Sequence, residues 1–189
     1  HPEVVGTMGQ LPEGAVILVE DEAQAERVRV PDPENLAYAT QTTLSVRETE
    51  GVLRILKRRF PAIVGPRRED ICYATTNRQR AVETIAPEAD LTLVIGAPNS
   101  SNSRRLVEVA LAAGCPRAQL LESASAMDWT LLEGVSKVAV SAGASAPESL
   151  VDGLIDALRD RFEVAVREIR VVKEDVTFRA PPIPLRRAS

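Results

Sequence analysis

The chain has 189 residues, of which 44% are apolar, 26% charged and only 3% aromatic, and its formal net charge is −4. This composition is typical of a globular protein of one or two domains, and no uncharged apolar run is long enough to cross a membrane. The acidic balance and the scarcity of aromatic rings argue against a nucleic-acid partner, and two cysteines without paired spacing predict no disulfide framework and favour the reducing cytoplasm.

Apolar strands and amphipathic helices alternate along the sequence. The run 15–19 is of strand type, the polar stretch 20–27 is expected at the surface, and 36–40 predicts a second strand. Ser45 and Glu48 have the spacing of a capping box and open a helix to about Phe60, because Pro61 forbids its continuation. The remaining predicted elements are strand 71–74, helix 78–85, strand 91–95, helix 103–113, strands 119–121 and 138–141, a helix from a second capping box at Ser145 and Glu148 to about Phe162, and a final strand 164–172 followed by an extended arm at 181–184.

Strands separated by helices of this length predict an α/β fold with a parallel sheet. Ligands of such sheets bind beyond the carboxyl ends of the strands, where loops enter helices. The loops 40–45, 72–77, 99–103 and 141–145 place hydroxyls, amides and small residues there. Such residues at helix starts are common N-caps, but four such loops on one edge favour a phosphate or diphosphate site.

An internal repeat is predicted at an offset of about a hundred residues, because 38–45 resembles 139–145 and Arg58-Arg-Phe60 resembles Asp160-Arg-Phe162. We expect one repeat at 1–67, without its first strand-helix-strand, a complete repeat at 68–163, and a C-terminal strand and tail at 164–189. Because the sequence also lacks an initiator Met and a signal peptide, we expect it to be part of a longer protein.

Five motifs resemble those of the 4-hydroxy-3-methylbut-2-enyl diphosphate reductases, the LytB family. They are HPEVVGTMGQ at 1–10, TQTTLS at 40–45, DICYATTNRQ at 70–79, NSSNS at 99–103 and AGASAP at 142–147, in the family's order and over nearly the whole chain. The resemblance implies a trefoil of three similar α/β domains around a central iron-sulfur cluster. It also implies that this chain is the C-terminal part.

The resemblance assigns roles to residues of these motifs. Cys72 is implied to be one of three cysteine ligands of a 4Fe-4S cluster, with the other two upstream of His1. The residues alone would favour a buried structural cysteine at Cys72, and Cys115 is expected to be one. Glu3 is implied to deliver a proton. The substrate-binding residues implied are His1, Thr42, Ser100, Ser101, Asn102 and Ser145, with Thr43, Asn77 and Gln79 supporting them.

The activity that the resemblance implies is reductive dehydroxylation of an allylic diphosphate to isopentenyl and dimethylallyl diphosphate, in non-mevalonate isoprenoid biosynthesis. No nicotinamide or flavin fingerprint occurs, so a ferredoxin- or flavodoxin-type donor is expected. The isolated chain is expected to be inactive. Two alternatives stay open, a non-catalytic α/β anion-binding module and one half of a split reductase whose other part is a separate chain.

Overall fold

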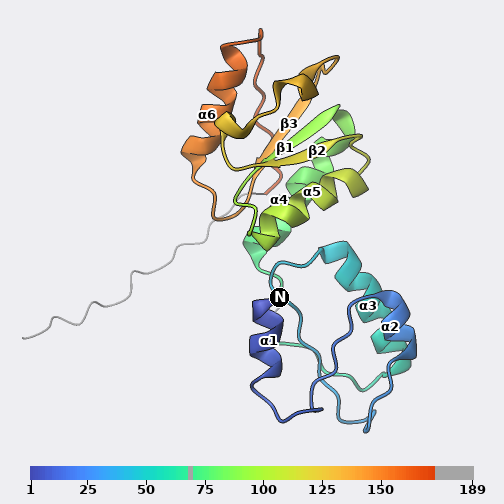
Figure 1. Cartoon of the computed structure of the whole chain (residues 1–189). Helices are drawn as coiled ribbons and strands as arrows, with labels where there is room; N and C mark the ends of the chain where they lie inside the picture. Colours follow the sequence, from blue (N-terminus) through green and yellow to red (C-terminus); the bar gives the residue numbers. More distant parts are fainter. Residues whose placement is uncertain (68–69, 173–189) are drawn as a thin grey trace, which may run out of the picture.

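The computed structural model describes residues 1–67 and 70–172, which form two lobes that meet near the start of α4 (Figure 1). The first lobe contains α1 (Pro2–Met8), α2 (Glu22–Arg27) and α3 (Val46–Arg59). The second contains α4 (Tyr73–Ile85), β1 (Leu91–Ile95), α5 (Ser101–Ala112), β2 (Ala118–Leu121), β3 (Val138–Ala142) and α6 (Glu148–Arg159), with 3-10 turns at Ala86–Glu88, Ala124–Ala126 and Trp129–Leu132. None of the helices described is long and apolar enough to span a membrane.

The second lobe is built on a parallel sheet of order β2-β1-β3, so the predicted α/β class is confirmed. All residues of β1 are buried. Leu91, Leu93 and Ile95 pack toward α6, whereas Val94 packs toward α4 and α5 on the opposite face (Figure 1). Since Ile95 pairs with Ala142, the loops that leave β1 and β3 are neighbours at one edge of the sheet.

The first lobe has a smaller core, formed where α2 packs on α3 around Ala25, Ile55, Leu56 and Phe60. The strand predicted at 15–19 is wrong, because this segment has no sheet partner among the described residues and leaves Ile17 and Leu18 exposed. The strand predicted at 36–40 is reduced to one parallel bridge between Ala37 and Val64. The polar stretch at 20–27 instead forms α2, which Asp21 caps by accepting the Gln24 N–H at 2.6 Å.

Three further predictions fail for physical reasons. The strand at 71–74 is absent because α4 already begins at Tyr73, so the chain there has helical rather than extended dihedrals. Ser145 does not cap α6, which starts only at Glu148, since Ala146 precedes Pro147 and is disfavoured from helical dihedrals. Residues 164–172 form no strand, and the arm predicted at 181–184 lies outside the described residues.

The other predicted elements are confirmed within a few residues: the helices at 45–60, 78–85, 103–113 and 145–162, and the strands at 91–95, 119–121 and 138–141. The capping box at Ser45 is formed on one side. Ser45 Oγ accepts the Glu48 N–H at 3.3 Å, while the Glu48 carboxylate pairs with Arg105 of the other lobe at 3.0 Å.

Candidate functional site

The N-terminus of α5 is in close contact with the loops at the sheet edge. Ser100 is the N-cap, accepting the Ser103 N–H at 3.3 Å and the Ser103 hydroxyl at 3.0 Å. A Cβ at either Gly96 or Gly143 would lie only 2.1 Å from Ser103 Oγ. Glycine at both positions therefore lets the loops after β1 and β3 close onto the start of α5.

Asn102 lies in the first turn of α5 and faces the loop after β3. Its side chain is buried, its Nδ2 lies 3.6 Å from the position that a Cβ of Gly143 would occupy, and its Oδ1 has no hydrogen-bond partner. The Gly143 N–H donates to the Ile95 carbonyl at 2.8 Å, and this bond fixes the turn that leads to the exposed Ser145. The predicted residues Ser100, Ser101 and Asn102 and the Ser145 loop thus follow adjacent strands.

A second group of predicted residues is joined by hydrogen bonds across the chain. The Glu3 carboxylate accepts both the backbone N–H and the hydroxyl of Thr42, each at 3.2 Å. The Thr42 carbonyl accepts the Cys72 N–H at 3.1 Å. At the start of α1 the His1 ring accepts the Glu3 N–H at 3.2 Å. His1 and Cys72 are 71 residues apart in the sequence, and these hydrogen bonds bring both into the group around Thr42.

The two cysteines have opposite environments. Cys72 is an exposed thiol at the N-cap position of α4, beside a groove of about 430 Å³ lined also by Tyr73, Thr76 and Arg80. Cys115 is buried, with its Sγ 3.2 Å from the Thr92 hydroxyl and 3.1 Å from the Arg117 carbonyl. Only Cys72 is therefore accessible to a metal, and within residues 1–67 and 70–172 no group of three His, Cys, Asp or Glu side chains could hold one.

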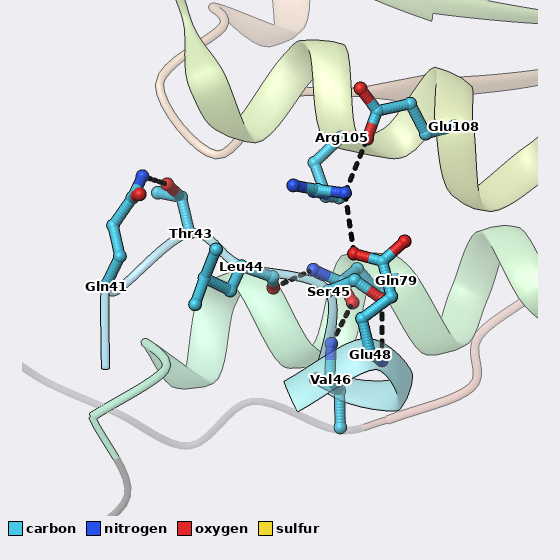
Figure 2. Close-up of polar contacts among 9 residues, drawn as sticks. All are labelled: Gln41, Thr43, Leu44, Ser45, Val46, Glu48, Gln79, Arg105 and Glu108. Atoms are coloured by element: carbon cyan, nitrogen blue, oxygen red, sulfur yellow. Dashed lines mark hydrogen bonds and ion pairs between the residues drawn. The ribbon is translucent and has the colours of Figure 1, made fainter. Parts of the chain in front are cut away.

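The loop that carries Thr42 is attached to the second lobe by contacts that the sequence does not reveal. Gln79 of α4 donates to the Leu44 carbonyl at 2.8 Å and accepts the Val46 N–H at 3.0 Å (Figure 2). Earlier in the loop, the Thr40 N–H donates to the Asp70 carboxylate at 2.6 Å. Asp70 lies within a motif but received no role, because nothing in its local pattern points to a partner 30 residues away.

Thr43 is held inside the same loop, since the Gln41 side chain donates to its hydroxyl at 2.7 Å (Figure 2). Its side chain therefore stabilises the loop itself. The structure thus brings the predicted site residues together in two groups. One surrounds Thr42 at the junction of the lobes, and the other lies at the edge of the sheet.

The model of the LytB protein family matches residues 1–159. The chain is 59% identical over 183 residues to the 4-hydroxy-3-methylbut-2-enyl diphosphate reductase of Ruegeria sp. (strain TM1040), a match that covers 97% of this chain and 58% of that enzyme. It is 56% identical over 181 residues to the reductase of Gluconobacter oxydans, covering 96% of this chain and 54% of that enzyme. The chain thus spans little more than half the length of these relatives.

Among solved structures, the E-1-hydroxy-2-methyl-but-2-enyl-4-diphosphate reductase from Plasmodium falciparum superposes with a TM-score of 0.78 at 32% sequence identity. The superposition covers 92% of this chain and 56% of that structure. The range matched by the family model includes both groups of candidate site residues. This chain is therefore a member of the LytB family.

Proposed function

We propose that this chain forms part of an iron-sulfur reductase that converts 4-hydroxy-3-methylbut-2-enyl diphosphate to isopentenyl and dimethylallyl diphosphate in the non-mevalonate pathway. The observation that carries the proposal is the meeting of Glu3, Thr42 and Cys72. It places a carboxyl group, a hydroxyl and an exposed thiol around one short loop. The names of the relatives supply the reaction.

Cys72 fits the role of a single ligand to a 4Fe-4S cluster. Its thiol is exposed at the start of α4, and cysteine sulfur is the ligand that holds iron-sulfur clusters. Cys115 is unsuited because it is enclosed by Thr92 and Arg117. The two remaining cysteine ligands would come from the part of the relatives that this chain does not span. When bound, the cluster would supply electrons one at a time.

Glu3 is suited to deliver the proton that the leaving hydroxyl needs. Its carboxylate is partly buried, and both of its oxygens face Thr42, one toward the N–H and the other toward the hydroxyl. Thr42 therefore fixes the orientation of the acid and offers a hydroxyl that can pair with the substrate alcohol. His1 accepts the Glu3 N–H and would contact the same end of the substrate.

The sheet edge is suited to hold the diphosphate. Ser100, Ser101, Asn102 and Ser145 present hydroxyls and an amide there, and the first backbone N–H groups of α5 have no partner within the helix. The unpaired atom of the buried Asn102 amide is its acceptor Oδ1, so the Nδ2 group of that amide would be the donor to the diphosphate. If the diphosphate end of the substrate binds at this edge, the allylic alcohol at its other end would extend toward Thr42 and Glu3.

A ferredoxin- or flavodoxin-type donor would supply the electrons, and a reducing compartment such as the cytoplasm would keep Cys72 as a thiol. The part of the reductase that this chain does not span would be the closest protein partner. It would supply the missing ligands and the walls that exclude water from the reacting carbon.

The test joins this chain to the part of the Ruegeria sp. reductase that it does not span, followed by anaerobic reconstitution and counting of iron and sulfide. We expect Cys72→Ser to lose the cluster and activity, while the matched control Cys115→Ala keeps both. Glu3→Gln keeps the size of the side chain but cannot donate the proton, so kcat should fall by about a hundredfold or more at nearly constant KM. Ser100→Ala removes a bond to a charged group worth roughly 1.5 to 3 kcal/mol and should raise KM by about tenfold or more.

Two outcomes would contradict the proposal. A normal cluster in Cys72→Ser would exclude that residue as a ligand. A chimaera that binds a full cluster but does not reduce the diphosphate would favour a non-catalytic role for this segment.

A further inference from the structure

Gln79 makes a pair of hydrogen bonds that joins the two lobes. Its side chain is 2% exposed, although it stands in the second turn of a helix at the junction. The amide donates to the Leu44 carbonyl at 2.8 Å and accepts the Val46 N–H at 3.0 Å, so it bridges both sides of Ser45 (Figure 2). One side chain thus satisfies two backbone groups of a segment that is 33 to 35 residues away in the sequence.

We propose that Gln79 is a positioning residue, which holds the Thr42 loop and, through it, the Glu3 carboxylate against Cys72. The proposal rests on the function proposed above for these three residues. The hydrogen bonds of Gln79 go to Leu44 and Val46 and not to any of these three residues. Its effect would be transmitted by the short backbone segment between Thr42 and Val46.

The loop is attached to α4 at two points. At the start of the helix the Thr42 carbonyl accepts the Cys72 N–H at 3.1 Å, and seven residues later Gln79 holds Leu44 and Val46. Seven residues of α-helix rise by about 10 Å, while four residues of extended chain span at most about 14 Å. The segment from Thr42 to Val46 contains turns at 42 and 43 and a bend at 44, so it spans less than this limit; because it is attached to α4 at both ends, fixing its far end restricts where Thr42 can lie.

The Thr40–Asp70 bond holds the loop on the other side of Thr42, and the remaining contacts between the lobes are weaker candidates for this role. The Glu48 carboxylate pairs with Arg105 at 3.0 Å, but the Glu48 side chain is 70% exposed, and ion pairs in water contribute little to stability (Figure 2). Ser45 is used inside its own helix as the cap of α3. Gln79 is buried, so losing its amide would leave the partly buried Leu44 carbonyl and Val46 N–H without this partner.

The first experiment measures site-resolved hydrogen exchange in this chain for Gln79→Met, which keeps the volume but loses both hydrogen bonds. The amides of Thr42, Val46 and Cys72 report directly, because each donates to one of the contacts described. We expect their protection to fall by about tenfold or more. Gln119→Met, on β2, is the matched control and should leave all three unchanged.

A graded variant separates the two bonds. Gln79→Glu retains an acceptor for the Val46 N–H but, when ionised, has no donor for the Leu44 carbonyl. We expect protection at Val46 to persist while protection at Thr42 and Cys72 falls. Unchanged protection at all three amides in Gln79→Met, or a loss confined to Val46 in that variant, would overturn the proposal, because Gln79 would then be only a local support of α3.

The second experiment measures kcat per intact cluster and KM in the chimaeric reductase. Gln79→Met should lower kcat by about tenfold or more at nearly constant KM, because the acid is displaced while the diphosphate loops are untouched. If Gln79→Met lowers the protection of the loop amides but leaves kcat unchanged, the positioning role is refuted and the proposed function still stands. A wild-type chimaera without reductase activity would refute the proposed function, and the exchange data alone would then decide whether Gln79 holds the loop.

Discussion

Replacing either of the two glycines that face Ser103 should destabilise the second lobe, but by different mechanisms. A Cβ at Gly143 would lie 2.1 Å from Ser103 Oγ but 3.3 Å from Ser103 Cβ. The clash is therefore with the hydroxyl, which can rotate away. A Cβ at Gly96 would lie 2.1 Å from Oγ and also 2.6 Å from Cβ, so rotation of the serine cannot relieve it and the backbone must move.

These distances set the expected magnitudes. In Gly143→Ala, rotation of the hydroxyl breaks its bond to Ser100 Oγ, which costs about 1 kcal/mol. In Gly96→Ala, the overpacking should cost roughly 1 to 3 kcal/mol, and the upper end is expected because a backbone shift in a buried strand end is required. Ser103→Ala alone loses the same hydrogen bond and should cost about 1 kcal/mol.

The decisive measurement is a pair of double-mutant cycles with Ser103→Ala, followed by urea unfolding. Trp129 is the single tryptophan and packs against the core of the second lobe, so its fluorescence reports the unfolding of that lobe. Gly143→Ala with Ser103→Ala should be no less stable than Ser103→Ala alone, while Gly96→Ala should remain costly in both backgrounds. Equal rescue at both glycines would refute the packing described for this edge.

Two further predictions concern groups outside this edge. Iodoacetamide should label Cys72 at least about a hundredfold faster than Cys115, since only Cys72 is exposed, and comparable rates by peptide mass spectrometry would contradict the burial of Cys115. The N–H groups of Lys137 and Ser136 donate to the Asp90 carboxylate at 2.9 Å and hold the pKa of that carboxyl below the ordinary 3.8. The Asp90 carboxylate should therefore stabilise the fold above pH 3.8, and this stabilisation should be lost in more acidic solution as the carboxylate is protonated. Asp90→Asn should therefore lower the urea midpoint at pH 7 and approach the wild type in acid, whereas a constant difference would assign the effect to shape rather than charge.

The elements that could be predicted from sequence are those whose stabilising partners are close in the chain or whose residues are buried on both faces. Ser45 and Pro61 mark the limits of α3 because a cap and a missing N–H act locally. The run at β1 is apolar enough to require burial on either side. The strands predicted at 15–19 and 71–74 failed because a strand needs a partner, and no local pattern states whether one exists.

The residues of the candidate site were predicted from the motifs alone. The family pattern pointed to Glu3, Thr42 and Cys72, and the structure places them in contact through Thr42. The motif pointed to Gln79 as a supporting residue, but its burial and its two hydrogen bonds were harder to foresee, because a glutamine within a helix is usually exposed. Its importance depends on a loop more than thirty residues earlier, and neither helix periodicity nor capping rules encode such a pairing.

The two lobes differ in how much of their apolar surface they bury, and this difference predicts unequal local stability. The second lobe has large buried clusters on both faces of its sheet, whereas the first relies on the small core between α2 and α3. Val5, Leu11 and Ile17 of the first lobe are exposed by 70%, 56% and 45%. Amides of 1–40 should therefore exchange faster than those of β1. Adding the part of the Ruegeria sp. reductase that this chain does not span should slow exchange in the first lobe more than in the second, because unpaired backbone and apolar side chains gain partners there. An equal change in both lobes would mean that the exposed surface of the first lobe is not a contact surface of the longer reductase.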